Sequence, residues 1–188
     1  MGNNEKDVLL DVKNLKTYFK LASGTARAVD GVSFQLRRGE TLGVVGESGS
    51  GKSVMAKSVI RLLENSARIE EGSITFEGRD VLSFGKKELR DYRGRDIGMI
   101  FQDPMTSLDP VFKVGKQMTE NLRIHRNMNK AEAREVAINA LRSVGIPNPE
   151  ARFESYPFEL SGGMCQRVII AMALCCNAEV IIADEPTT

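Results

Sequence analysis

The sequence predicts an α/β fold in which short buried strands alternate with helices, and three observations support this. A short apolar run at residues 41–45 fits a strand buried on both faces. A glycine-rich loop follows it, and Ser53–Leu63 then has apolar residues at helical spacing. A second apolar run, Val180–Ala183, fits another buried strand. Between these segments, Asp103–Leu160 is rich in helix-forming residues and predicts a helical insertion.

The remaining strands are expected in the N-terminal half. Residues Val8–Val12 and Ala28–Leu36 have strand-like composition, with Gly24 as a turn signal between them. Two further strands are expected at Gly72–Glu77 and Ile97–Phe101. These segments add strands on the N-terminal side of the helical insertion.

Three longer helices are expected in the C-terminal half. Two of them are Val114–His125 and Lys130–Val144, and Gly145 and Pro147 end the second. The third is a long helix that starts at Ser161 and runs through Cys176. The lone histidine, His125, lies between charged residues, so we expect it on a helix surface.

Composition narrows the class of protein. The 188 residues suffice for one sizeable domain, 41% are hydrophobic, and the net charge is +1. Without a broad basic field, no nucleic-acid partner is expected. We also expect no membrane-spanning segment, because no apolar run is long enough. The three cysteines, Cys165, Cys175 and Cys176, include no C-x-x-C pair and predict buried thiols.

The glycine-rich loop matches the pattern G-x-x-x-x-G-K-S of a phosphate-binding P-loop. Glycines let the backbone turn tightly and direct N–H groups toward phosphate oxygens, and the following helix adds partial positive charge. We expect the lysine to reach the β- and γ-phosphates and the final serine to place its hydroxyl on Mg²⁺. The alternative is a chance glycine-rich turn. The eight residues are Gly46, Glu47, Ser48, Gly49, Ser50, Gly51, Lys52 and Ser53.

Two carboxylates follow the apolar run Val180–Ala183 and fit a Walker B strand end. Asp184 is expected to hold Mg²⁺ through its hydration shell. Glu185 points differently and is the candidate to orient and deprotonate the attacking water. Taken alone, this pattern is weak and usually marks only the end of a strand; behind a P-loop, it predicts a catalytic site.

The segment Leu160–Arg167 reads L-S-G-G-M-C-Q-R and predicts a second anion site. A serine followed by two glycines at a helix start presents a hydroxyl, bare N–H groups and a helix dipole together. The alternative is a capping serine with flexible glycines.

The P-loop, the L-S-G-G segment and the strand ending in Asp184 and Glu185, in this order along the chain, resemble the ABC ATPase family. The resemblance implies that Ser161, Gly162 and Gly163 contact the γ-phosphate of ATP held by the P-loop of another subunit. Gln102 follows the strand Ile97–Phe101 and matches the family's Q-loop, so it would sense Mg²⁺ and the attacking water.

The resemblance also assigns a nucleobase contact. Phe19 occupies the place of an aromatic residue that stacks on adenine, whereas Tyr18 would face the other side of the strand. We favour Phe19; either could belong to the core. The phosphate-binding segment extends to Val54.

Three longer segments resemble the oligopeptide, dipeptide and nickel importer ATPases: Gly46–Val54, Gln102–Pro110 and 182–188. Within that group, the pairing of Ser50 with Val54 resembles the first of two paired ATPase subunits. This resemblance implies an ATP-hydrolysing subunit that powers a dipeptide or oligopeptide importer, with nickel as the alternative cargo. Two departures are Phe158 and Cys165, which stand where relatives commonly carry His and Arg.

This resemblance implies an α/β P-loop NTPase core of the ABC type, with an antiparallel β subdomain and an inserted α-helical subdomain. We assign residues 1–102 and 162–188 to the core and about 103–161 to the helical subdomain. The family continues beyond Thr188, so we expect a C-terminally incomplete core. Such a fragment is expected to bind Mg-ATP weakly and to hydrolyse it very slowly.

The resemblance also implies ligands and partners. ATP and Mg²⁺ are the expected cofactors. A second ABC ATPase subunit, identical or different, and transmembrane permease subunits are the expected partners, with an extracytoplasmic substrate-binding protein acting indirectly. The location implied is peripheral, on the cytoplasmic face of the membrane.

Three other functions are alternatives for this sequence. A soluble ABC ATPase of DNA repair or translation would carry long coiled coils, but the chain between Gln102 and Ser161 is short and has no sustained heptads. A P-loop kinase or GTPase would not need the L-S-G-G segment. A non-catalytic binding fragment remains open.

Overall fold

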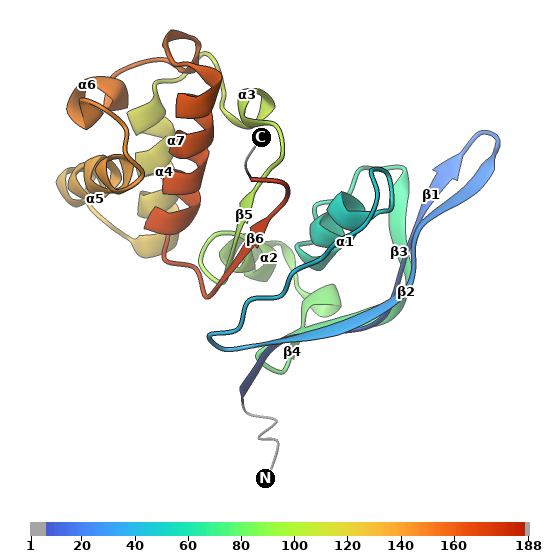
Figure 1. Ribbon diagram of the computed structural model, residues 1–188. Coiled ribbons are helices and arrows are strands. Elements are labelled where there is room, and N and C mark those ends of the chain that lie inside the picture. Colours follow the sequence, from blue (N-terminus) through green and yellow to red (C-terminus); the bar gives the residue numbers. More distant parts are fainter. Residues whose placement is uncertain (1–6, 187–188) are drawn as a thin grey trace. The chain divides into compact units, whose positions relative to one another are not determined.

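The computed structural model describes residues 7–186, and Figure 1 shows its helices and strands. The chain divides after Leu89 into two compact units, which are described separately below. The predicted division into a core and a helical subdomain at residues 103–161 uses different boundaries and stays a prediction.

A four-stranded antiparallel sheet forms the first unit, with strand order β2-β1-β3-β4. Its strands are β1 (Val8–Leu21), β2 (Gly24–Arg37), β3 (Ala67–Phe76) and β4 (Arg79–Asp80). The three predicted strands of this region are therefore present, and all three are longer than expected. The strands extend beyond their predicted ends because backbone hydrogen bonds to a neighbouring strand can keep polar residues extended, although strand propensity alone does not favour them.

Helix α1 (Lys52–Val59) packs on this sheet through small side chains. Thr17 and Ser58 are fully buried, and their hydroxyl oxygens lie 2.9 Å apart in a hydrogen bond that joins β1 to α1. The predicted helix Ser53–Leu63 was too long at its C-terminal end. Arg61 has a left-handed φ of 54°, and its guanidinium donates to the carbonyls of Val81 and Phe84, so it leaves the helix.

The predicted buried strand at residues 41–45 is wrong in this structure. The segment pairs with no strand within the described range 7–186, and Val45 is 95% exposed. An apolar run supplies strand propensity, but a strand forms only where neighbouring strands satisfy its N–H and C=O groups. The composition of the run alone does not determine whether such a neighbouring strand is present.

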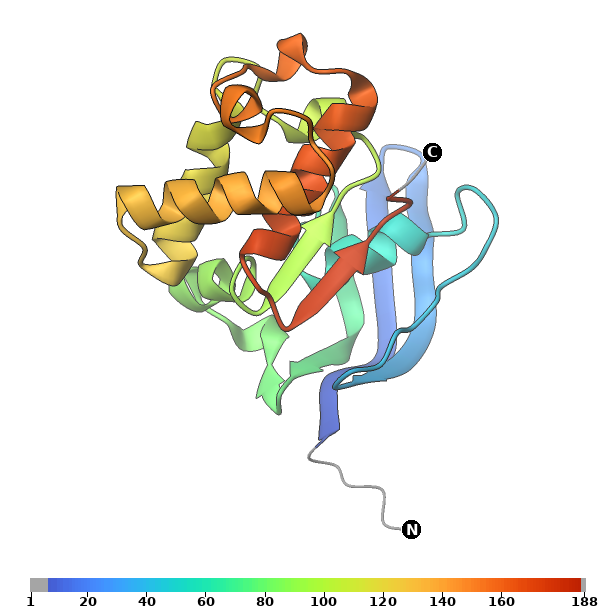
Figure 2. The ribbon, with the colours of Figure 1, turned by 60° about the vertical axis from the view of Figure 1, so that its left-hand side comes forward.

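The second unit combines a small parallel sheet with helices. Strands β5 (Ile97–Ile100) and β6 (Val180–Ala183) pair in parallel and lie side by side in Figure 2. Both strands were predicted. The helices are α3 (Pro104–Ser107), α4 (Val114–Arg126), α5 (Lys130–Ser143), α6 (Pro149–Phe153) and α7 (Gly162–Cys175), and α2 (Lys86–Tyr92) precedes them across the unit boundary.

The core of the second unit lies among α4, α5 and α7. The apolar faces of these helices are fully buried, as at Met118, Leu141 and Val168. At the start of α5, the Asn129 side chain accepts from the Glu132 N–H while the Glu132 carboxylate accepts from the Asn129 N–H. This reciprocal capping box satisfies two amides at the helix start and stabilises it. These packed helices position the two segments at the ends of β5 and β6.

His125 departs from the prediction that it is a surface residue. It is half-buried near the end of α4, and a Cβ at Gly94 would come within 2.6 Å of its Nε2. Gly94 has a φ of 147°, so the turn that it occupies suits glycine, and the imidazole fills the space beside it. Buried against this turn, the His125 Nδ1 has no hydrogen-bond partner among the described residues.

Among residues 7–186, no helix combines the length and the apolar composition that crossing a membrane requires.

Candidate functional site

The glycine-rich loop occupies the turn between β2 and α1 in the first unit. Gly51 has a φ of 94°, and a Cβ there would lie 2.1 Å from the carbonyl oxygen of Ala28 in β2. Only glycine therefore fits where the loop passes β2 and α1 begins. Because Gly51 has no side chain, none caps the first N–H groups of α1. The loop thus presents a helix N-terminus, the feature that favours anions.

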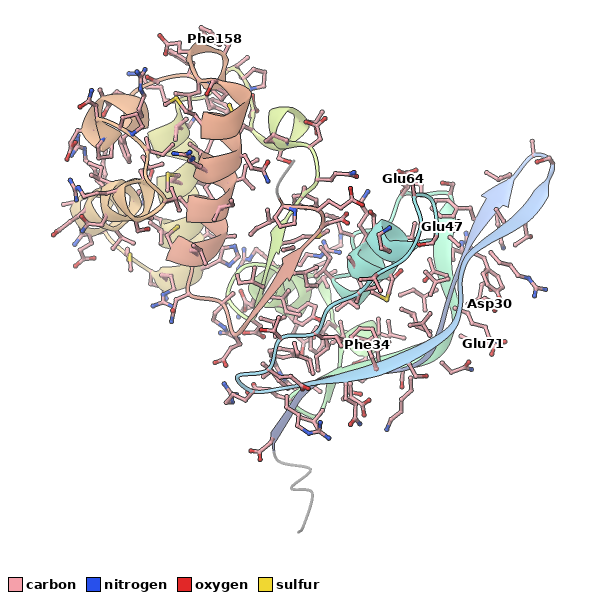
Figure 3. The ribbon with its side chains drawn as sticks, in the orientation of Figure 1. Asp30, Phe34, Glu47, Glu64, Glu71 and Phe158 are labelled. Atoms are coloured by element: carbon pink, nitrogen blue, oxygen red, sulfur yellow. The ribbon has the colours of Figure 1, made fainter. Side chains whose placement is uncertain are left out.

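Lys52 folds back over the loop. Its Nζ donates to the carbonyl oxygens of Gly46 (2.8 Å) and Glu47 (3.0 Å). Ser50 N–H also donates to the Glu47 carbonyl, which closes the turn. Figure 3 labels Glu47 in this loop. The ammonium group is therefore held at the loop, where a polyphosphate chain would need a positive charge.

The other residues predicted for this segment lie nearby in the chain. Ser48 and Gly49 are exposed in the loop, and Ser53 and Val54 are half-buried in the first turn of α1. Gly49 has a φ of 77°, and a Cβ there would meet no atom within 4 Å. The predicted P-loop residues thus form one continuous feature of the first unit.

Phe19 lies on the same face of β1 as Thr17, because alternate residues of a strand share a face. Thr17 is bonded to α1, so that face is the α1 side of the sheet. Tyr18 points to the opposite face, where its hydroxyl donates to Asp30 Oδ1 at 2.6 Å. Figure 3 labels Asp30 on the sheet. This arrangement favours Phe19 over Tyr18 as the nucleobase contact, which stays a prediction.

The register of β1 and β2 also brings this region near the loop. Phe19 pairs with Ala26, and Ala28 is the extra residue of a bulge between the pairs Tyr18–Arg27 and Thr17–Val29. The carbonyl of this bulge residue is the group that Gly51 approaches. The aromatic side chain and the loop are therefore positioned by the same short stretch of β2.

In the second unit, the structure brings Gln102 and Glu185 together. The Gln102 Nε2 donates to the Glu185 Oε2 at 2.7 Å. The two side chains meet because β5 and β6 are parallel neighbours, and parallel strands end at the same edge of a sheet. The Asp184 N–H donates to the Ile100 carbonyl at 2.9 Å, which extends the pairing to the last residue before Glu185.

Glu185 has a left-handed φ of 48°, which is uncommon for a residue other than glycine. Its neighbour Asp184 is only 8% exposed, so the two carboxylates have different surroundings. Strained backbone of this kind is typical of functional sites. The predicted division of tasks between the two carboxylates stays a prediction.

The L-S-G-G segment forms the start of α7. Ser161 is the N-cap, and its hydroxyl accepts from the Met164 N–H at 3.3 Å. Gly162 and Gly163 are exposed, and a Cβ at either would meet no described atom within 4 Å. Packing within the chain does not require these glycines, so their bare N–H groups are free to be approached closely by another molecule.

The two departures near α7 are accommodated locally. Phe158 is 70% exposed and stacks on Tyr156 with ring centroids 5.4 Å apart, and Figure 3 shows it before α7. Cys165 is fully buried, and its thiol donates to the Pro157 carbonyl at 3.5 Å. Burial raises the pKa of the Cys165 thiol, so it stays protonated and inert.

One contact was not predicted from the sequence. The Gln166 Nε2 donates to the Pro186 carbonyl at 2.5 Å, which joins α7 to the residue after Glu185. The position of Gln166 in the L-S-G-G-M-C-Q-R motif could have marked it as a candidate. The residue type alone does not indicate which carbonyl group its side-chain amide contacts. Thr187 and Thr188, the end of the third resembling segment, lie outside the described residues.

The sequence profile of the family described as ABC transporter matches residues 29–188. The chain belongs to the ABC transporter family. Among curated relatives, it is 51% identical to the probable peptide ABC transporter ATP-binding protein y4tR of Sinorhizobium fredii (strain NBRC 101917 / NGR234) over 188 residues. That match covers 100% of this chain and 56% of the relative.

It is also 51% identical to the oligopeptide transport ATP-binding protein OppD of Bacillus subtilis (strain 168) over 181 residues, covering 96% of this chain and 51% of OppD. The chain thus spans about half the length of these curated relatives.

Solved structures confirm the predicted fold class. The dimeric post-hydrolysis state of the ATP-binding cassette MJ0796, bound to ADP and Pi, matches with a TM-score of 0.85 and 28% identity. The match covers 95% of this chain and 75% of that chain. This likeness shows the α/β cassette fold for the present chain.

Proposed function

We propose that this chain is the nucleotide-binding portion of the ATP-binding subunit of a peptide importer, and that it binds and hydrolyses ATP. The names of its relatives support peptide rather than nickel as the cargo, because y4tR and OppD are named for peptide and oligopeptide transport. The proposed catalytic residues are Lys52, Gln102 and Glu185.

The observation that carries the proposal is the geometry of the glycine-rich loop. The close approach of Gly51 to Ala28 fixes where α1 begins, and Lys52 is held over the loop carbonyls. Uncapped amides and an ammonium group together favour the phosphates of a nucleotide. In this proposal, Phe19 stacks on the adenine ring.

The residues proposed to hold Mg²⁺ are Ser53 of the first unit and Gln102 and Asp184 of the second. All three offer oxygen atoms, the ligands that Mg²⁺ prefers. In the part of the chain that the structure describes, no group of three or more His, Cys, Asp or Glu side chains could hold a metal. Mg²⁺ is usually bound by few protein ligands together with water and substrate phosphates. When bound, it would neutralise phosphate charge.

Glu185 is the proposed group that orients and deprotonates the attacking water. Its carboxylate is held by Gln102 at 2.7 Å, so the position of the base depends on the Q-loop side chain. Phosphoryl transfer to water needs placement and charge neutralisation more than covalent chemistry. Positioning of this carboxylate is therefore the main contribution of the second unit.

The second anion site suggests a dimer. Ser161 caps α7, and the space beside Gly162 and Gly163 is open among the described residues. We propose that these three residues contact the γ-phosphate of a nucleotide held by a second ATPase subunit. MJ0796 is dimeric in its solved structures, which supports this arrangement. Permease subunits, an indirectly acting substrate-binding protein and a peripheral location on the cytoplasmic face of the membrane complete the proposal.

Nucleotide binding is the direct test. Titration calorimetry with Mg-ATP should show binding by the folded chain, and Lys52→Met should weaken it roughly ten- to a hundredfold, because charged hydrogen bonds contribute about 1.5–3 kcal/mol. Lys57→Met, which removes a half-buried lysine from the last turn of the same helix, is the matched control and should leave affinity unchanged. A folded chain that takes up no Mg-nucleotide at millimolar concentration would contradict the proposal.

Hydrolysis separates an ATPase from a non-catalytic binding fragment. Phosphate release should be measurable for the chain with its partner subunit, and Glu185→Gln should abolish it while binding persists. If the wild type and Glu185→Gln both bind Mg-ATP but neither releases phosphate, the result would favour a non-catalytic binding fragment.

A further inference from the structure

The backbone immediately after β6 is held at three points. The Asp184 N–H donates to the Ile100 carbonyl, and the Glu185 side chain accepts from Gln102. The Pro186 carbonyl accepts from Gln166 at 2.5 Å. Between the first and third of these points lies Glu185, the residue with a φ of 48°.

The third point has particular weight because of the residue involved. Proline has no N–H, so its carbonyl is the only backbone hydrogen-bonding group at residue 186. Gln166 is half-buried on α7, a helix otherwise packed in the core of the second unit. A helix packed in the core thus directs a neutral amide donor at the only backbone hydrogen-bonding group of the residue that follows Glu185.

We propose that Gln166 is a positioning residue: it ties α7 to the backbone at Pro186 and so sets where the Glu185 carboxylate points. Without this tie, the left-handed backbone at Glu185 relaxes toward a commoner conformation, and the carboxylate moves away from Gln102. For its catalytic meaning, the inference rests on the proposed function of Glu185.

The tie has a consequence for two nucleotide sites. Ser161 caps the same helix five residues before Gln166, at the end proposed to face the nucleotide of a second subunit. A shift of α7 when that end engages a phosphate is passed through Gln166 to the carboxylate of its own chain. Gln166 thereby links occupancy of the partner's site to the position of the local base.

The first experiment needs neither nucleotide nor activity. In two-dimensional NMR of the full chain, the side-chain amide of Gln102 should move when its partner is removed in Glu185→Ala, because the two side chains are hydrogen-bonded. Gln166→Met keeps side-chain length but removes the donor, and it should move the Gln102 amide most of the way to its position in Glu185→Ala. Gln166→Ala serves as a second variant should the first fail to fold.

Arg167→Ala is the matched control. Arg167 is the next residue of α7 and also donates to a carbonyl, that of Gly145 at 2.9 Å, but it does not contact the segment after β6. This variant should keep the Gln102 side-chain amide at its wild-type position in the spectrum. A wild-type position of that amide in a folded Gln166 variant would overturn the inference, whether or not the chain binds ATP.

Kinetics give the second readout once wild-type turnover is established. Misplacement of a reacting group by about 1 Å can cost on the order of a hundredfold in rate, so Gln166→Met should lower kcat roughly ten- to a hundredfold with little change in KM. Arg142→Ala, which removes a guanidinium bonded to Glu150 and lies outside the predicted site segments, should leave both constants near wild type. A wild-type kcat in the Gln166 variant refutes the positioning role, whereas absence of turnover in the wild type counts against the proposed function alone.

Discussion

Replacing Gly51 with alanine would test how the glycine-rich loop is held against the sheet. Two costs apply at this position. The first is the left-handed φ of 94°, which costs about 1–2 kcal/mol for a residue with a Cβ. The second is steric, because the new Cβ would lie 2.1 Å from the Ala28 carbonyl oxygen, a backbone atom that no side-chain rotation can move aside.

Gly49 offers a matched comparison in the same loop. Its φ is 77°, but a Cβ there would meet no atom within 4 Å, so only the first cost applies. Alanine also reduces the entropy of the unfolded chain, which offsets about 0.4–1 kcal/mol at both positions. Gly49→Ala should therefore destabilise by about 1 kcal/mol. Gly51→Ala should lower the free energy of unfolding by a further ~1–3 kcal/mol, the usual cost of overpacking.

The assay is urea unfolding of both variants and the wild type under identical conditions, followed by Mg-ATP titration of each folded protein. Gly51→Ala should also bind nucleotide more weakly than Gly49→Ala, because the displaced loop carries the phosphate-binding amides. If the two variants unfold within about 0.5 kcal/mol of each other, the close approach to Ala28 does not hold the loop, and the reasoning fails.

Three further predictions concern stability and reactivity. Burial lowers the pKa of His125 in the folded chain, whereas in the unfolded chain it is about 6.5. Below about pH 6.5 the unfolded chain therefore binds a proton more readily than the folded chain. The free energy of unfolding should be at its full value above about pH 6.5 and should fall below it. Urea unfolding at pH 7.5 and pH 5.5 should show a smaller change in the free energy of unfolding for His125→Asn than for the wild type. An equal change in the two proteins would disprove the contribution of His125. Thr17→Val removes the buried hydroxyl bonded to Ser58 and should destabilise by about 1 kcal/mol in thermal or urea unfolding; no loss would show that the bond contributes nothing net. The buried Cys165 thiol should react with an alkylating reagent only at the rate of unfolding, and rapid labelling of the native protein at this residue, seen by peptide mass spectrometry, would refute its burial.

The three long helices of the second unit, α4, α5 and α7, were predicted because local signals mark them. Asn129 begins α5 as a capping residue, Gly145 with a φ of 74° follows its end, and Ser161 caps α7. Caps and helical periodicity act within a few residues, so they can be read from the chain without knowledge of its neighbours. The short strand Val180–Ala183 was also recognisable from local sequence, as a continuous apolar run.

The run at 41–45 shows the opposite case. It has the composition of a buried strand, yet in the structure it is exposed and pairs with no strand in the described range. Pairing requires a partner brought from elsewhere in the chain, which a local pattern does not specify. The half-burial of His125 beside Gly94 was missed because it depends on a distant turn in the same way.

The amino-acid sequence by itself determined the chemistry of this protein: a loop of glycines with Lys52, a serine with two glycines at a helix start, and adjacent carboxylates at Asp184 and Glu185. These motifs are contiguous, so their residue types and spacing are sufficient to recognise them. Only the tertiary structure decided that Gln102 bonds to Glu185 and that Gln166 bonds to Pro186. Those contacts join residues separated along the chain, and the pairing of β5 with β6 and the packing of α7 bring them together.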